Sequence, residues 1–126
     1  MNRALVPLAV IGLTAALAPL ACGSPATAPQ FVPGGDPSAG RAAITHYGCG
    51  ACHTVPGIHG AVALVGPPLI HWSRRGFIAG KLPNTPPNLI AWIEDPQAVW
   101  PGNDMPNLHV SPTDARDIAA YLDRIG

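Results

Sequence analysis

The sequence predicts an all-α fold in which three to four helices are joined by long loops. Three segments begin with a polar capping residue followed directly by proline, and apolar residues then recur at helical spacing. No alternating strand pattern and no internal repeat is evident. Sixteen prolines and fourteen glycines in 126 residues leave little regular structure from which to build a core. Long loops of this kind are sensible around a central cofactor.

The expected helices share one kind of start. The first begins at Asp36-Pro37 and runs toward Gly48, the second begins at Thr85-Pro86 and ends before Pro96, and the third begins at Ser111-Pro112. Each places an N-cap side chain before a proline at the first helical position. Residues 97–108 are expected to be loop. A glycine inside a helix costs roughly 1 kcal/mol relative to alanine, so Gly40 indicates that another helix packs closely there.

The stretch Cys49-Gly50-Ala51-Cys52-His53 has the attachment pattern of a c-type haem. The two thiols add across the vinyl groups at one edge of the porphyrin, and a single helical turn holds both of them there. The next residue then directs its imidazole toward the iron. The motif predicts one covalently bound haem c, attached through Cys49 and Cys52, with His53 as an axial ligand.

Two other readings of the cysteine pair remain open from the motif alone. A zinc site needs two further ligands, usually a second close pair. The remaining histidines form no such pair; they are His46, His59, His71 and His109. A thioredoxin-like redox pair needs a strand–helix–strand context, which the flanking sequence does not offer.

A low-spin haem iron needs a sixth ligand, and methionine or histidine is the usual donor. Apart from Met1 in the leader, the chain has one methionine, Met105, in the sequence Pro-Gly-Asn-Asp-Met-Pro. Its flanks are polar and not helical, which argues against an ordinary core methionine. We therefore expect Met105 to be the second axial ligand. His109 is the first replacement if that bond breaks.

The first 21 residues have the pattern of an export signal. Arg3 provides a positive start, and the run from Ala4 to Ala21 is almost wholly apolar. Cys22 follows this run directly, which resembles a bacterial lipoprotein signal whose cysteine becomes the lipidated N-terminus. Release as a soluble protein and retention on an uncleaved anchor remain alternatives. We expect an exported protein on the periplasmic side of the cytoplasmic membrane, held there by a lipid anchor.

Residues 22–35 are rich in proline, glycine, serine and alanine and carry no charge. This composition is typical of a flexible linker. The remaining segment, residues 36–126, is expected to form one domain.

The order of motifs over residues 36–126 resembles class I cytochrome c. That family has an N-terminal helix, CxxCH, a Gly-Pro-x-Leu segment, a helix ending in proline, a PGxxM loop and a C-terminal helix. All six are present in that order. The stretch 66–105 is similar to the cytochrome c domains associated with haem–copper terminal oxidases, although it has Pro68 and Pro87 where acidic residues are expected. It also shows no copper-binding portion of the kind found in oxidase subunit II.

The resemblance implies roles for particular residues. The carbonyl of Pro67 should accept the Nδ1–H of His53, and Leu69 should pack on the proximal face of the haem. Arg75 should pair with a haem propionate, and its neighbour Arg74 either shares this task or is solvated. Trp92 should lie in the pocket near the methionine ligand, or be ordinary core.

Two more residues bear on the fold. The resemblance implies that Gly40 and Tyr121 mark the crossing of the first and last helices.

An electron carrier is the function that the resemblance implies. It would be a periplasmic-side monohaem protein that passes single electrons in a respiratory chain, to or within a terminal oxidase. The sequence shows no pair of carboxylates and no nucleophile–base arrangement, so we expect no separate catalytic site and no small-molecule substrate. The alternative is a haem enzyme or a gas or redox sensor with a labile methionine ligand. A purely structural oxidase subunit has no sequence feature in its favour.

The charge balance bears on the partners. Without Arg3, the mature chain from Cys22 has six Lys and Arg against seven Asp and Glu, and Lys81 is its only lysine. The ring of lysines that steers many diffusing cytochromes is absent. An apolar docking surface, or a tether that replaces steering with effective concentration, fits better. We expect redox partner proteins and no nucleic acid.

Overall fold

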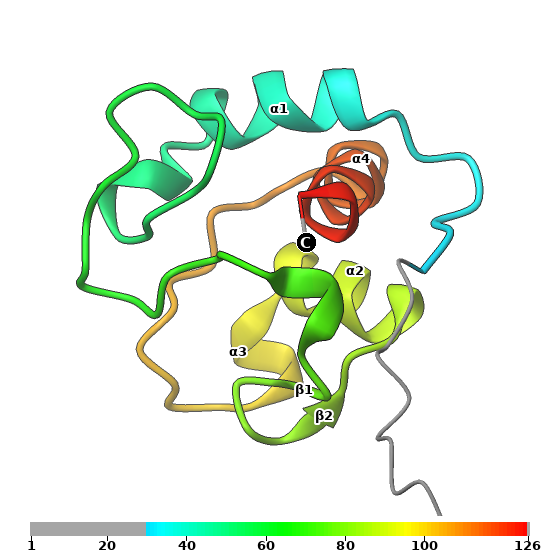
Figure 1. Ribbon diagram of the computed structural model, residues 1–126. Coiled ribbons are helices and arrows are strands. Elements are labelled where there is room, and N and C mark those ends of the chain that lie inside the picture. Colours follow the sequence, from blue (N-terminus) through cyan, green and yellow to red (C-terminus); the bar gives the residue numbers. More distant parts are fainter. Residues whose placement is uncertain (1–29, 126) are drawn as a thin grey trace, which may run out of the picture.

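Two helices that cross each other, α1 (Pro37–His46) and α4 (Pro112–Arg124), form the framework of the molecule (Figure 1). A third, α2 (Pro86–Glu94), packs against α4. The computed structural model describes residues 30–125. The predicted leader, Cys22 and most of the predicted linker lie outside these residues. The predicted all-α class, with long loops between few helices, is confirmed.

The crossing of α1 and α4 depends on Gly40, as predicted. A Cβ atom at this position would lie only 2.0 Å from the carbonyl oxygen of Asp117, so the two helix backbones touch here. Tyr121 is buried one turn further along α4. Its hydroxyl donates a hydrogen bond to the carbonyl of Pro56 at 2.6 Å, which attaches the loop after the cysteine motif to α4.

Two of the three predicted N-caps make the expected hydrogen bond. The Asp36 side chain accepts from the N–H of Ser38 at 2.8 Å, and the Ser111 hydroxyl accepts from the N–H of Asp114 at 3.1 Å. Thr85 occupies the cap position of α2, but its side chain makes no capping bond. Pro87 removes the N–H of the second helical residue, which is one of the two that a cap side chain can bond.

The structure departs from the predicted loops in two places. Strands β1 (Phe77–Ile78) and β2 (Leu82–Pro83) form an antiparallel hairpin, although no strand was predicted. Two residues per strand are too few to show an alternating pattern. A short helix, α3 (Pro96–Val99), lies within the stretch expected to be loop. The Asp95 carboxylate caps it by accepting the N–H groups of the second and third helical residues, at 3.1 and 3.0 Å.

The end of the predicted linker packs on the domain. Val32 is buried in the core, and Gly35 lies against α4, where a Cβ atom would come within 2.7 Å of the Ala120 Cβ. The Gln30 side-chain amide donates to the carbonyl of Asn84 at 2.6 Å. Residues 30–35 therefore belong to the folded domain and not to the linker. Residues 22–29 lie outside the described part.

One core unites all these elements. It consists of apolar side chains from α1, α2 and α4 together with Val32, Val55, Ala61, Trp72, Ile78 and Val110. The loop after the cysteine motif is fixed by Val55, whose N–H donates to the carbonyl of Ala61 at 3.0 Å. Within residues 30–125, the structure has no helix with the length and apolarity needed to cross a membrane.

Candidate haem-binding site

The cysteine motif lies on one tight turn directly after α1. Gly48, with a φ of 70°, reverses the chain, and the 3₁₀ helix η1 (Cys49–Ala51) follows. The N–H groups of Cys52 and His53 both donate to the carbonyl of Cys49, at 3.2 and 3.0 Å. Both thiols are free and half-buried. This turn holds the two cysteines close together, as their attachment to one edge of a porphyrin requires.

His53 is oriented by the segment that follows the loop. Its Nδ1 lies 2.7 Å from the carbonyl oxygen of Pro67, so the predicted hydrogen bond is confirmed. A carbonyl only accepts, so Nδ1 carries the proton and Nε2 keeps its lone pair. Gly66 makes this approach possible, because a Cβ there would lie 2.4 Å from Cε1 of the His53 ring. The N–H of Gly66 donates to the carbonyl of Cys52 at 2.8 Å, which fixes the two segments to each other.

The two other readings of the cysteine pair find no support in the described residues. Burial raises the pKa of the Cys49 thiol, whereas a reactive redox cysteine has a lowered pKa. The motif is also flanked by α1 and an irregular loop, not by strands. Within residues 30–125, no group of three or more His, Cys, Asp or Glu side chains is placed to hold a metal ion, as a zinc site requires.

A cation and an unpaired donor lie side by side near the start of the hairpin. The Arg75 guanidinium donates to the carbonyls of Pro68 and Ile70 and lies 5.0 Å from the centre of the Trp72 ring. Burial lowers the pKa of Arg75, while its neighbour Arg74 is exposed. Trp72 is in the 3₁₀ helix η2 (Trp72–Arg74), and its buried Nε1–H has no hydrogen-bond partner among the described residues. These two donors suit the carboxylate of a haem propionate, so the chain fits the cofactor here.

The Asn84 side chain holds the segment that carries Trp72 and Arg75 in place. Its Nδ2 donates to the carbonyls of Trp72 and Arg75, at 3.1 and 3.0 Å. Asn84 is itself buried at the end of the hairpin. The missed hairpin therefore has a consequence for the site, because it brings this amide to the backbone of both donors.

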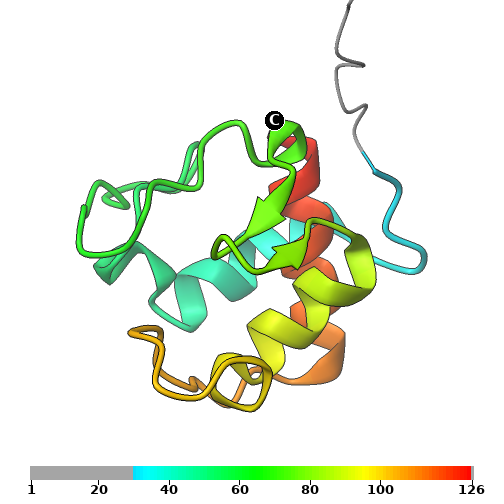
Figure 2. The same cartoon turned by 90° about the horizontal axis from the view of Figure 1, so that it is seen from below.

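Met105 lies in the irregular segment between α3 and α4. It is half-buried and packs against the hydrophobic core, as does Leu69, while Trp92 is within that core on α2. Figures 1 and 2 show residues 49–53 and 101–109 on the same side of α4 from two directions at right angles. Leu69 and Trp92 lie outside these two segments, and the shared hydrophobic core connects them with Met105.

Four residues at this face had no role assigned from the sequence. Trp72 could have been suspected from its place three residues before Arg75, and Gly66 from its place before the His53 acceptor. Gln97 and Asn103 contact the backbone of Met105 through their side-chain amides. Isolated Asn and Gln residues in a loop are so common that no sequence signal marks these two.

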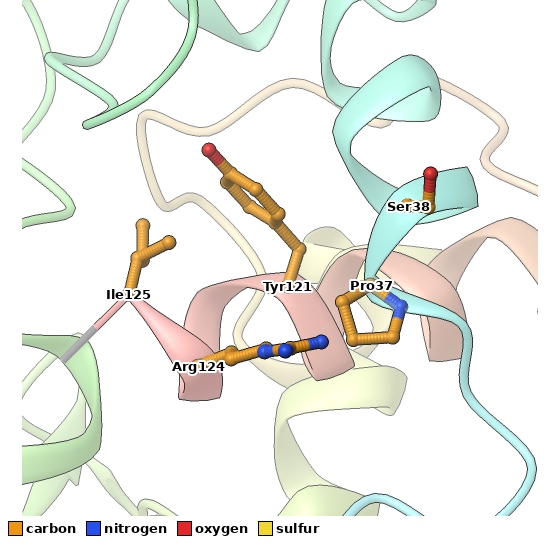
Figure 3. Close-up of a pocket in the computed structure, with 5 residues that line it drawn as sticks. All are labelled: Pro37, Ser38, Tyr121, Arg124 and Ile125. Carbon is orange, nitrogen blue, oxygen red and sulfur yellow. The ribbon is translucent and has the colours of Figure 1, made fainter.

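A separate hollow lies between the start of α1 and the end of α4 (Figure 3). It is open and lined by Pro37, Ser38, Tyr121, Arg124 and Ile125. The Tyr121 hydroxyl points away from Arg124 and is bonded to the Pro56 carbonyl. The hollow contains one charged group and no acid–base pair, so it provides no arrangement for catalysis.

Two cysteines on one turn that form no disulfide, followed by an oriented histidine, are the arrangement of a c-type haem protein. The cytochrome c family model matches residues 38–125, and the chain belongs to this family. It is similar to a protein named cytochrome c oxidase subunit 2 from Alkalihalophilus pseudofirmus, at 39% identity over 84 residues. That match covers 66% of this chain and 24% of the relative, so the chain spans about a quarter of the relative's length.

These similarities confirm four predictions. The chain is a class I cytochrome c related to oxidase-associated domains, and its fold is that of the class. Its cofactor is covalently attached haem c. It is a haem electron-transfer protein.

Proposed function

We propose that this protein is a monohaem electron carrier whose axial ligands are His53 and Met105. The observation that supports this most directly is the hydrogen bond from His53 Nδ1 to the Pro67 carbonyl, at 2.7 Å. It leaves Nε2 as the nitrogen available to a metal, and such a bond raises the basicity of the ligand. When bound, haem c supplies an iron that accepts or releases a single electron. The chain's residues hold and tune that cofactor, and no substrate needs to enter.

Met105 is the best-placed second ligand. It is the one methionine beyond the leader, and it lies half-buried in a polar loop on the face that also carries the cysteine motif. A methionine ligand raises the reduction potential relative to a second histidine. A raised reduction potential suits a protein that donates electrons to a terminal oxidase.

The remaining pocket residues have supporting roles. Cys49 and Cys52 attach the haem covalently, and Leu69 packs on its proximal side. Trp92 closes the core near the methionine. Arg75, together with the Nε1–H of Trp72, donates to a propionate, which would pair both the half-buried cation and the buried indole donor.

The partner is a respiratory redox protein, and a terminal oxidase fits best. The name of the similar relative, cytochrome c oxidase subunit 2, supports this choice. No Asp, Glu, Lys or Arg occurs between Arg41 and Arg74, a stretch that contains the haem motif. Three apolar side chains there are largely exposed: Val62 at 75%, Leu64 at 76% and Val65 at 83%. Such a surface docks on an apolar partner, so electron transfer should depend only weakly on ionic strength.

The location that fits this function is the periplasmic side of the cytoplasmic membrane, with Cys22 lipidated. Cys22 lies outside the described residues, and the support comes from its position directly after an apolar leader. Two acyl chains provide the stable anchoring that one chain does not. Intact mass spectrometry of the native protein tests this. A mature species that begins at Cys22 with lipid mass supports the anchor, whereas one that begins at Thr27 without lipid rules it out.

The ligation is tested by spectroscopy of Met105 variants. We expect the oxidised wild-type protein to show the long-wavelength absorption band specific to iron–methionine coordination. Met105→Ala should abolish this band and open a site for carbon monoxide, while Met105→His should remain six-coordinate with a markedly lower potential. If Met105→Ala changes neither the spectrum nor ligand binding, another residue is the ligand, and His109→Ala identifies or excludes the first suspect. Carbon monoxide binding to the wild-type protein would favour the sensor or enzyme reading instead.

A further inference from the structure

Both backbone groups of Met105 are held by side-chain amides. Its N–H donates to Oδ1 of Asn103 at 2.8 Å, and its carbonyl accepts from Nε2 of Gln97 at 2.8 Å. Residues 101–109 form no helix or strand, so no regular backbone pairing is available to fix this residue. Its position therefore depends on these two side chains.

The two amides also organise the rest of the loop. Gln97 donates to the carbonyl of Asn103 at 2.8 Å and accepts the N–H of Gly102 at 3.1 Å. Asn103 donates to the carbonyls of Pro96 and Trp100, at 2.8 and 2.7 Å. Every polar atom of both amide groups is thus bonded to backbone. A network in which each member is satisfied specifies one conformation.

The base of this network is rigid. Gln97 belongs to α3, which the Asp95 carboxylate caps, and the side chain of Pro96 is fully buried. The loop is therefore attached through Gln97 to an element that is itself anchored in the core.

We propose that Gln97 and Asn103 are positioning residues. They order the Met105 arm of the haem site, the loop of residues 101–109, before the methionine coordinates the iron. The inference rests on the proposed function, since it takes Met105 as the sixth ligand. A ligand that is already ordered loses less conformational freedom on coordination, so the network strengthens the iron–sulfur bond without touching the metal. Without the network, the arm spends more time away from the iron. An added ligand binds only the form of the protein in which Met105 is away from the iron. Its apparent affinity therefore rises in proportion to the fraction of protein in that form.

The experiment compares amide variants of the holoprotein with a matched control. Gln97→Glu keeps an oxygen that accepts the Gly102 N–H. It replaces the amide N–H that donates to the Met105 carbonyl with a carboxylate oxygen, which cannot donate. Asn103→Asp keeps the acceptor for the Met105 N–H and loses the two donor bonds. The control is Asn107→Ala, because the Asn107 side chain makes a bond of the same local type, to the N–H of His109 at 2.8 Å.

The readouts are the iron–methionine band, the affinity of the ferric protein for imidazole, and the reduction potential. We expect Gln97→Glu and Gln97→Ala to raise the apparent imidazole affinity by about 10-fold or more, the usual range when an outer-shell partner is lost. Asn103→Asp should have a smaller effect than Asn103→Ala, and the control none. Covalent haem content and helical circular dichroism should stay at wild-type values throughout, which separates positioning from unfolding.

Two results overturn the inference, and they are distinguishable. A wild-type protein without the iron–methionine band removes the proposed ligation and the positioning role with it. A wild-type protein with the band, whose Gln97 and Asn103 variants match Asn107→Ala in imidazole affinity and potential, leaves the ligation intact and removes the positioning role alone.

Discussion

The haem site has two arms that are held by different kinds of hydrogen bond. The His53 arm consists of the cysteine motif and the Gly66-Pro67 segment, and the Met105 arm is the loop of residues 101–109. On the His53 arm, backbone groups provide the bonds: the Pro67 carbonyl holds the imidazole, and the Cys52 carbonyl accepts from Gly66. On the Met105 arm, the bonds come from side-chain amides. No side-chain truncation removes a backbone carbonyl, so the hydrogen bond that orients His53 is disturbed by crowding the imidazole ring. The Met105 arm can be loosened by single substitutions, which makes it the adjustable half of the site.

The two arms also differ in charge. The His53 arm lies within a stretch without Asp, Glu, Lys or Arg, whereas Glu94, Asp95 and Asp104 flank the Met105 arm. The two arms therefore differ in the charged side chains that the sequence places beside them.

The largest expected effect comes from removing the attachment on the His53 arm. Cys49→Ala with Cys52→Ala should leave a chain without covalent haem that is largely unfolded, because long loops and few helices supply too small a core. Acid–acetone extraction of haem and far-ultraviolet circular dichroism measure the two parts of this prediction. Cys22→Ser is the control and should keep the haem. A compact double variant would show that the α1–α4 framework folds without the cofactor.

A smaller effect is expected from crowding the imidazole. In Gly66→Ala, the new Cβ would lie within 2.4 to 3.0 Å of three His53 ring atoms, so the ring must move and its bond to Pro67 weakens. Overpacking of this kind costs about 1–3 kcal/mol of stability. Weaker donation from the histidine should also raise the reduction potential.

Gly76→Ala is the matched control for this substitution. A Cβ there would meet nothing within 4 Å, and the residue's φ is not in the left-handed region. We expect the control to keep the wild-type potential and to lose no stability. Equal potentials in Gly66→Ala and Gly76→Ala would contradict the view that Gly66 sets the orientation of the imidazole.

The contrast between the arms explains what the sequence could predict. The His53 arm depends on a motif of fixed spacing and on a Gly-Pro segment, and both the thiol turn and the Pro67 acceptor were predicted. Helix starts were predicted at three of the four places where a cap and a proline coincide, whereas Asp95-Pro96 was read only as the end of α2. The hairpin and α3 were missed because each is only a few residues long. The amide network was missed because Gln97 and Asn103 gain their roles only from the folded loop, where distant backbone groups converge.

The two arms meet at Asp114. Its carboxylate accepts from the hydroxyls of Tyr47 and Ser111, each at 2.8 Å. Tyr47 precedes the cysteine motif, and Ser111 ends the loop that carries Met105. The Tyr47 hydroxyl also accepts the N–H of Ser111 at 3.3 Å. One carboxylate thus joins the start of one arm to the end of the other.

The smallest expected effect is an acid sensitivity of this joint. Hydrogen bonds from Tyr47 first and Ser111 second lower the pKa of Asp114 below its ordinary 3.8. A lowered pKa means that the folded protein favours the carboxylate, so the stabilisation is fully present above the ordinary value and is lost as the pH falls through the lower one. Asp114→Asn should therefore lower the melting temperature slightly at neutral pH. The difference in melting temperature between this variant and the wild-type protein should narrow below about pH 4. Exposed Asp104→Asn is the control for removing one loop carboxylate. A gap that stays constant from neutral to acid pH would mean that the charge of Asp114 does not stabilise the joint.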